Sequence, residues 1–283
     1  MTERNLPANS GSIEDIASAE LPATETLILS WITDRVLCVT LNRPEVANAF
    51  NTKMAIEVMQ VFESISMHVN GIRCVIVTGS GSRAFCAGGD LKERQGMTND
   101  QWSRQHLVYE RMLRAVINCP HPVIGAVNGA AFAGGLELAA ACDFIYAVDS
   151  ARFALTETSL GIIPGAGGTQ TLTRAIGSRR AKELILGAIP FSAADAESWG
   201  LVNQVVASED LMDTVTALAI RIAANAPIAV RQAKQSIRIG ADLPMAEALA
   251  FEIEAYNRCV PTQDRQEGVD AFNEKRKPDF TGS

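Results

Sequence analysis

The sequence predicts an α/β fold with a largely parallel sheet, followed by a helical C-terminal region. Three observations support this prediction. Apolar runs of strand length alternate with segments of helical spacing through residues 26–210, an order typical of parallel sheets with crossover helices. Several runs are almost continuously apolar, as in strands covered on both faces. From residue 211 onward only helical patterns occur, separated by Pro227, Pro244 and Pro261.

The first half of the predicted core begins with two strands. Residues 26–33 and 35–41 are rich in β-branched and apolar side chains on either side of a short turn. A helix follows over residues 51–68, because the apolar side chains recur on one face. The run IRCVIVT at residues 72–78 predicts a buried strand, and a glycine-rich loop over residues 79–90 comes after it.

The second half of the predicted core repeats this alternation. We expect a helix around residues 101–117 and a buried strand over residues 122–127. Small residues then lead into a helix at residues 134–141 and a strand at residues 144–148. Four further helices are predicted near the C-terminus: residues 211–225, 229–239, 245–260 and 264–275.

The chain divides into three predicted parts. Residues 1–25 are polar and acidic, so we expect a flexible arm rather than a signal or transit peptide. Residues 26–210 form the α/β core. Residues 211–283 form a helical region whose apolar surface packs on the core or on a neighbouring subunit. The six cysteines are scattered without a CxxC pair, which fits free thiols in a reducing, cytoplasmic compartment.

The composition argues against several classes of function. The chain has 25 basic and 32 acidic residues, a net charge of −7, whereas nucleic-acid-binding proteins normally carry a basic excess. We therefore expect no nucleic-acid partner. Three histidines and scattered cysteines offer no zinc-binding spacing, so no metal site is expected. The longest apolar run, residues 122–148, is interrupted by Asn128, Glu137 and Asp143, which argues against a membrane span.

Two glycine-rich segments follow buried strands and are expected to expose backbone N–H groups. In the first, Gly88 and Gly89 permit backbone conformations closed to other residues and let a ligand approach the main chain. A plain tight turn explains this pattern equally well. In the second, Gly134 and Gly135 stand where a helix begins, and the unpaired N–H groups of a helix N-terminus suit developing negative charge.

Two glutamates accompany these segments. Glu137 lies one turn into the second helix between apolar neighbours, so we expect a raised pKa; a glutamate that faces solvent is the alternative. Glu157 precedes the glycine-rich turn at residues 165–168, which lacks the lysine of a phosphate-binding loop. Paired carboxylates in surroundings of low polarity favour acid–base chemistry on an activated carbonyl compound. Nucleophilic catalysis fits less well, because the sequence has no GxSxG motif.

Five ordered segments resemble the enoyl-CoA hydratase/isomerase (crotonase) superfamily. They are LNRPEVANAF (41–50), AFCAGGDLKE (84–93), NGAAFAGGLELAAACD (128–143), TETSLGIIPGAGGTQTLTRAIG (156–177) and GVDAFNEKRKPDF (268–280). The resemblance implies a crotonase-like spiral of ββα units, with C-terminal helices that form trimers and with trimers that pair into hexamers. It also implies an acyl-CoA thioester substrate, in which coenzyme A is part of the substrate and no separate cofactor is needed.

The resemblance also assigns roles to individual residues. The backbone N–H groups of Gly89 and Gly134 match the oxyanion hole that binds the thioester oxygen. Glu137 and Glu157 match the two acidic positions of the hydratases, Glu137 as the base on a shared water and Glu157 as the proton donor to the α-carbon. Positions that match contacts with coenzyme A are Arg43, Ala47, Ala87, Gly89, Asp90, Leu91, Lys92, Phe272 and Lys275. Arg43, Lys92, Lys275, Arg276 and Lys277 are expected to cluster around this anionic ligand.

Other members of the superfamily leave alternatives open. DLKER at residues 90–94 and the ending VPTQDRQEGVDAFNEKRKP resemble the methylglutaconyl-CoA hydratase branch, which is also known for binding AU-rich RNA. A Δ3,Δ2-enoyl-CoA isomerase, which needs one carboxylate, and an RNA-binding homologue are the alternative functions. Residues 95–106 depart more freely from the family pattern, and the resemblance implies that acyl-chain specificity is set there.

Overall fold

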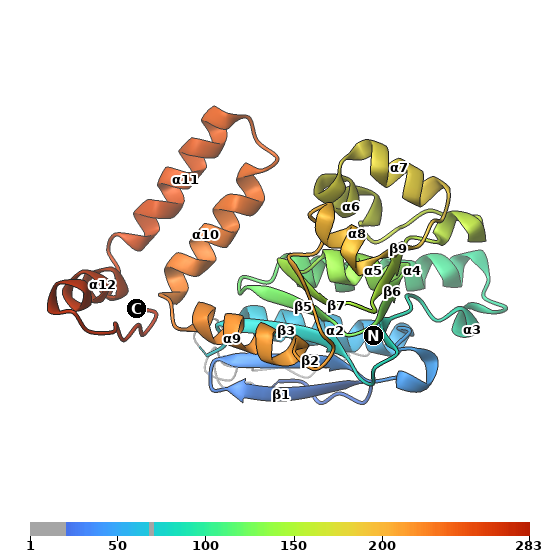
Figure 1. The fold of residues 1–283 in the computed structure, drawn as a ribbon, viewed down its shortest axis with the longest axis horizontal. Helices are drawn as coiled ribbons and strands as arrows, with labels where there is room; N and C mark the ends of the chain where they lie inside the picture. Colours follow the sequence, from blue (N-terminus) through green and yellow to red (C-terminus); the bar gives the residue numbers. More distant parts are fainter. Residues whose placement is uncertain (1–20, 68–70) are drawn as a thin grey trace, which may run out of the picture.

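The computed structural model of the protein describes residues 21–67 and 71–283. Its centre is a pair of mixed β-sheets surrounded by helices, with further helices at one end of the molecule (Figure 1). Of the predicted N-terminal arm, residues 1–20 lie outside the described part of the chain.

A six-stranded sheet forms the larger half of the core. In sheet order its strands are β1 (Leu27–Thr33), β2 (Val36–Leu41), β3 (Cys74–Gly79), β5 (Val123–Val127), β7 (Phe144–Val148) and β10 (Gln204–Val206). The β1–β2 pair is antiparallel and every other pair in this sheet is parallel, which confirms the predicted pairing. Every residue of β3 and β5 is buried, as expected for strands covered on both faces.

A second sheet of four strands supports the two glycine-rich segments. In sheet order its strands are β4 (Ala84–Cys86), β6 (Ala130–Phe132), β8 (Arg152–Ala154) and β9 (Phe191–Ser192). The prediction of an unbroken loop over residues 79–90 was wrong, because strands this short cannot show an alternating pattern. Since β4 and β6 are parallel neighbours, with Ala84 beside Ala130, the segments that follow them emerge side by side.

Helices pack around the sheets and lead into the functional segments. The two longest, α2 (Thr52–Met67) and α4 (Asn99–Ile117), lie against one another and match the predicted helices closely. A capping box between Thr98 and Gln101 begins α4. The shorter helices of the core are η1 (Pro44–Val46), α3 (Leu91–Arg94), α5 (Gly134–Ala140), η2 (Glu157–Leu160), α6 (Gly168–Ile176), α7 (Ser178–Leu186) and α8 (Ala193–Ser198).

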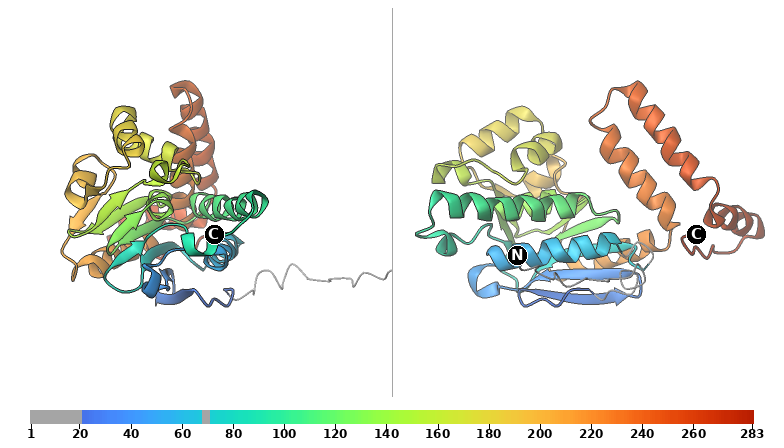
Figure 2. Two further views of the ribbon diagram at one scale, coloured as in Figure 1. Left: turned by 90° about the vertical axis from the view of Figure 1, so that its right-hand side faces the viewer. Right: turned by 180° about the vertical axis from the view of Figure 1, so that it is seen from behind.

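The four predicted C-terminal helices are present but differ in what they pack against. α9 (Leu211–Ala223) lies on the six-stranded sheet. α10 (Pro227–Gly240) and α11 (Met245–Cys259) form a pair that projects from the core, and α12 (Gln263–Glu274) follows (Figure 2). Among the described residues no single helix is long and apolar enough to span a membrane; α9 and α10, bent by 108°, meet the criteria of length and composition only as a pair.

Two buried polar side chains anchor the C-terminal tail. Arg73, just before β3, donates from Nη1 to Ala223 O at 3.1 Å and from Nη2 to Phe280 O at 2.6 Å. The carboxylate of Asp264 at the start of α12 accepts from Thr281 N at 2.8 Å. Because buried charged groups are stable only when they are hydrogen-bonded, these contacts fix where α12 and the tail lie relative to the core.

Candidate active site

One cavity of about 120 Å³ holds both glutamates. It lies among the segment after β4, the start of α5, η2 and the helices α3 and α4. Six residues that the sequence predicted for the site line it: Ala87, Gly89, Leu91, Gly134, Glu137 and Glu157. The structure therefore brings the two glycine-rich segments and both carboxyl groups into one space.

The Gly89 peptide reaches this cavity because of how the neighbouring peptides are bonded. Phe50 forms an isolated parallel bridge with Gly89, in which Phe50 N donates to Gly88 O and Asp90 N donates to Phe50 O. Successive peptide groups of an extended chain point to opposite sides, so the N–H of Gly89 points away from Phe50. A Cβ on Gly88, whose φ is +92°, would lie 3.0 Å from Gly134 N, so the two glycine-rich segments touch.

The N–H of Gly134 is unpaired because this residue begins a helix. Gly134 is the first residue of α5, after Ala133 has turned the chain with φ 49°, and the first N–H groups of a helix lack an intrahelical acceptor. A Cβ on Gly134 would clash with the ring of Phe50. In the described part of the chain neither Gly89 N nor Gly134 N donates to a protein acceptor, so both are available to an oxygen in the cavity.

Glu137 is buried in α5 with only 5% of its surface exposed. Its Oε1 accepts two backbone hydrogen bonds, from Ala166 N at 2.9 Å and from Gly168 N at 2.8 Å. Burial raises the pKa of this carboxyl, while the two N–H donors and the charge of His106 oppose the rise. The predicted burial and raised pKa are confirmed, and the two donors favour the ionised form that a base requires.

Glu157 lies in a different environment at the first position of η2. It is 6% exposed, and in the described structure its buried Oε2 has no hydrogen-bond partner. Burial raises its pKa from 4.5 to about 7, and the nearby charge of Glu137 adds to the rise. A carboxyl group that is about half protonated near neutral pH and has a free oxygen suits a proton donor.

Four residues predicted to contact coenzyme A lie near α3 but are not among the residues that line the cavity: Arg43, Ala47, Asp90 and Lys92. Arg43 Nη2 pairs with Asp90 Oδ2 at 3.0 Å, and the other oxygen of Asp90 caps α3 by accepting from Lys92 N at 3.0 Å. Ala47 O accepts from Ala87 N at 3.0 Å, which joins the two segments. The charge of Arg43 is therefore engaged within the protein, whereas the side chain of Lys92 is exposed.

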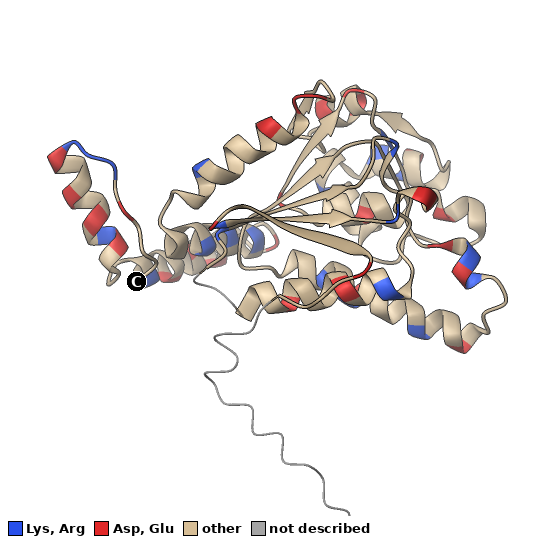
Figure 3. Ribbon diagram, turned by 90° about the horizontal axis from the view of Figure 1, so that it is seen from below, with Lys and Arg blue, Asp and Glu red and all other residues tan. Residues whose placement is uncertain are grey.

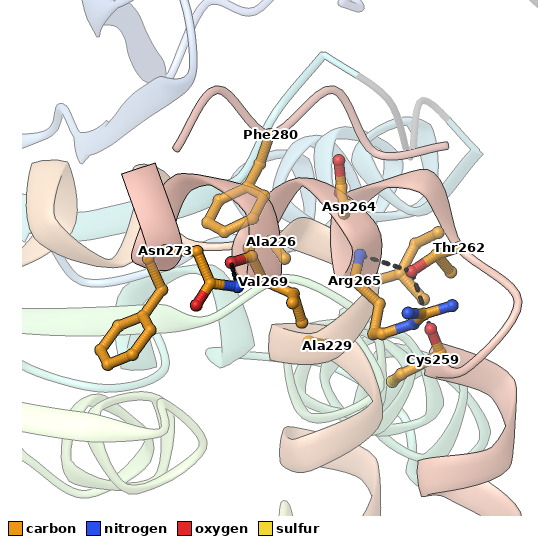
Figure 4. Close-up of a pocket in the computed structure, with 12 residues that line it drawn as sticks. Ala226, Ala229, Cys259, Thr262, Asp264, Arg265, Val269, Asn273 and Phe280 are labelled. Carbon is orange, nitrogen blue, oxygen red and sulfur yellow. Dashed lines mark hydrogen bonds between the residues drawn. The ribbon is translucent and has the colours of Figure 1, made fainter. Parts of the chain in front are cut away.

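Phe272 and Lys275 lie far from this cavity within the same chain. Both belong to the α12 region, at the opposite end of the molecule from α3 (Figure 1). Phe272 is 83% exposed and borders a second cavity, of about 610 Å³. Figure 4 shows this cavity among the C-terminal helices. Lys275 ends α12 with a left-handed φ of 57°. Neither residue joins the glutamates without a second copy of the chain.

The predicted basic cluster does not form within one chain. Arg43 and Lys92 lie near α3, whereas the other three basic residues follow α12. Arg276 pairs there with Glu267 at 2.5 Å and with Glu274 at 2.6 Å. Figure 3 shows basic and acidic positions close together on the segment near the C-terminus. The resemblance implied that Phe272 and Lys275 reach the coenzyme A of a neighbouring subunit, and one chain alone does not test the predicted cluster.

Several cavity residues were not singled out from the sequence as site residues. Phe50, Arg94, His106 and Tyr109 line the cavity from the rim and from α3 and α4. Arg94 is 9% exposed, donates from Nε to Gln105 at 2.8 Å and, in the described structure, pairs with no carboxylate. Only the packing of α3 and α4 against the glycine-rich segments brings these side chains to the site. The described residues contain no group of three or more His, Cys, Asp or Glu placed to hold a metal.

Comparison with known proteins identifies the family. The enoyl-CoA hydratase/isomerase family model matches residues 32–283. YngF of Bacillus subtilis is 45% identical over 258 residues, 91% of this chain and 99% of YngF. The short-chain-enoyl-CoA hydratase of Clostridium acetobutylicum is 40% identical and aligns over 86% of this chain and 93% of its own. The crystal structure of an enoyl-CoA hydratase from Bacillus anthracis has a TM-score of 0.90 at 42% identity, covering 92% and 100% of the two chains. The chain therefore belongs to the enoyl-CoA hydratase/isomerase (crotonase) superfamily and has its α/β fold of two mixed sheets followed by C-terminal helices.

Proposed function

We propose that the protein is an enoyl-CoA hydratase, which adds water reversibly across a 2-trans-enoyl-CoA to give a 3-hydroxyacyl-CoA. One observation carries this proposal. Two buried glutamates share a cavity, one with its carboxylate held by two N–H groups and the other with a raised pKa and an unpartnered oxygen. Hydration needs a base and an acid at the same time, and two environments of this kind separate those roles.

The geometry supports a mechanism with three parts. The thioester oxygen accepts hydrogen bonds from Gly89 N and Gly134 N, which stabilise the negative charge that develops on it. Glu137 takes a proton from water as the water oxygen bonds to carbon 3 of the acyl chain. Glu157 then gives its proton to carbon 2, and the double bond between these carbons is consumed. The next turnover begins once the proton held by Glu137 has passed to Glu157.

Labelled water distinguishes hydration from the alternative isomerase reaction. In oxygen-labelled water the enzyme should convert crotonyl-CoA to 3-hydroxybutyryl-CoA that carries one labelled oxygen, detected by mass spectrometry. A Δ3,Δ2-isomerase would move the double bond of a 3-enoyl-CoA without taking up label. Absence of a hydrated product across a panel of 2-enoyl-CoA thioesters would overturn the proposal.

We further propose that the acyl group is branched and bears a carboxylate, as in methylglutaconyl-CoA. Arg94 supports this finer assignment. Its guanidinium carbon lies 4.1 Å from the ring centre of Trp102, and Gln105 holds its Nε at 2.8 Å, yet no carboxylate of the described residues neutralises it. Burial of an unpaired cation is costly, so an anionic group on the substrate would offset that cost on binding.

The substrate assignment is tested separately from the reaction. Arg94→Met keeps the length of the side chain and removes its charge. We expect kcat/KM for methylglutaconyl-CoA to fall about 10- to 100-fold, the size expected for a lost hydrogen bond to a charged group, while crotonyl-CoA hydration changes little. Arg94→Lys should retain part of the preference. An equal loss for both substrates would make Arg94 structural and remove the case for a carboxylated acyl group.

We also propose that the protein self-associates as a trimer or a dimer of trimers. The support comes from large apolar side chains that α10, α11 and α12 leave exposed: Ile237, Met245, Leu249, Ile253, Tyr256 and Phe272. The nearby cavity has apolar walls that include Ala226, Val269 and Phe280 (Figure 4). Exposed apolar patches of this kind mark association surfaces. In such an assembly Phe272 and Lys275 would reach the coenzyme A bound to a neighbouring subunit.

A further inference from the structure

His106 on α4 touches both the catalytic cavity and the segment that holds Glu137. The side chain is half-buried and lines the cavity together with the two glutamates. Its ring lies directly against the backbone of Gly165, since a Cβ on Gly165 would lie 2.7 Å from His106 Nε2 and closer still to Cε1. The imidazole therefore limits where this segment of backbone can lie.

The segment that His106 contacts is the one that binds Glu137. Gly165 directly precedes Ala166, and the N–H groups of Ala166 and Gly168 donate to Glu137 Oε1 at 2.9 and 2.8 Å. A movement of Gly165 towards the space of the imidazole would carry Ala166 with it and lengthen at least one of these hydrogen bonds. The His106 ring therefore influences the orientation of the Glu137 carboxylate through the backbone of residues 165–166.

The charges around Glu137 add a second link. The titratable side chains that line the cavity are Glu157 from η2, Arg94 from α3, and His106 and Tyr109 from α4. Of these, His106 is the one whose positive charge favours the ionised form of Glu137. Neither nitrogen of its ring has a hydrogen-bond or ion-pair partner among the described residues, so its influence on Glu137 acts through space rather than through a direct hydrogen bond.

We propose that His106 is a positioning residue for the hydration reaction: its ring packs against Gly165 and supports the segment whose N–H groups hold Glu137, and it lines the same cavity as that carboxyl. The inference rests on the proposed hydratase activity and assigns His106 no contact with the reacting atoms. This role accounts for a half-buried histidine that faces the cavity and has no hydrogen-bond partner among the described residues. Glu137 then acts as a base although burial alone would favour its protonated form.

Two substitutions separate the charge from the packing. His106→Phe keeps a ring against Gly165 and removes the charge, so the acid limb of the kcat/KM–pH profile should move to higher pH by about half a unit to one unit. The direction follows because Glu137 without the nearby cation stays protonated to a higher pH. His106→Ala also removes the ring and should lower kcat by a further factor of about 10, with KM changed less than kcat.

Arg104→Gln is the matched control, because it removes one positive charge from the same helix at a solvent-facing position. Its pH profile should coincide with that of the wild type. The inference is overturned if the acid limb of His106→Phe coincides with the wild type, or if Arg104→Gln moves it equally. Wild-type hydration of a panel of 2-enoyl-CoA thioesters is measured first, because absence of product across the panel would reject the proposed function rather than the role of His106. Thermal unfolding of each variant confirms that the fold is retained.

Discussion

Glu137 and Glu157 are the same residue type in the same cavity, and their partners make them chemically different. Two backbone donors and the charge of His106 counter the effect of burial on Glu137, whereas Glu157 has a buried oxygen with no partner. Burial disfavours the charged form of any carboxyl, and hydrogen bonds to that form restore it. Glu137 is therefore suited to act as the base and Glu157 as the acid because backbone N–H groups donate to Glu137 and leave one oxygen of Glu157 without a partner in the described structure.

The raised pKa of Glu157 predicts a cost in stability that depends on pH. A carboxyl whose pKa rises from 4.5 to about 7 on folding binds a proton more tightly in the native state. The native state therefore loses stability as pH rises from 4.5 towards 7, by about 3 kcal/mol in total. Glu157→Gln removes this loss, so the variant should be more stable than the wild type at pH 8 and similar to it at pH 4.5. Urea unfolding at both pH values measures the difference; equal stability at pH 8 would contradict the raised pKa.

The sequence predicted the glutamates, the two glycine N–H groups, Ala87 and Leu91, but not the other residues that line the cavity. Glu137 was recognisable because a charged residue among apolar neighbours near a helix start is unusual. Arg94 and His106 lie in helical segments where charged residues are ordinary, and only the packing of α3 and α4 brings them to the cavity. Their roles therefore require the three-dimensional structure.

At the scale of elements, the short parallel strands β4 and β6 determine where the two glycine N–H groups lie. The sequence predicted five of the six strands of the larger sheet because they are long and apolar, and it missed the short β10. It missed the second sheet because β4 and β6 also have three residues each. These strands nevertheless direct two loops to one place. Pairing between distant short segments depends on tertiary contacts, which periodicity along the chain cannot report.

The start of α5 predicts a strict requirement for glycine at position 134. In Gly134→Ala the new Cβ would meet the ring of Phe50, so the ring or the backbone has to move. We expect a loss of about 1–3 kcal/mol in unfolding free energy and a fall in kcat of about 100-fold or more as the oxyanion donor shifts. Denaturant titration and turnover measure the two effects. Gly71→Ala, where a Cβ meets no atom within 4 Å, is the control. Full activity of Gly134→Ala would contradict this account of the oxyanion hole.

At the scale of the whole molecule, the projecting α10–α11 pair leaves a stripe of large apolar side chains exposed. Met245, Leu249, Ile253 and Tyr256 recur along one side of α11 and are all exposed. The spacing of three and four residues places them on a single stripe of the helix. The sequence predicted that the helical region would pack on the core or on another subunit, and for α11 the exposed stripe favours the second.

This stripe predicts how the assembly can be broken. Ile253→Asp places a charge in its centre and should convert the sedimenting species from a trimer or hexamer towards a monomer, because a buried unpaired charge opposes association. Arg258→Gln changes the net charge by the same amount on the other side of α11 and should leave the assembly intact. Sedimentation velocity of both variants measures the outcome. A wild-type protein that is monomeric and fully active would contradict the proposed assembly.

The central claim is that Glu137 and Glu157 together add one water across the double bond. The most direct measurement is the loss of the conjugated enoyl-thioester absorbance of crotonyl-CoA with the wild type, Glu137→Gln and Glu157→Gln. Each substitution keeps the size of the side chain and removes its ability to exchange a proton. We predict that kcat falls at least about 100-fold in each variant, as expected for the loss of a general acid or base, with both variants folded. Turnover at the wild-type rate by both variants would contradict the claim.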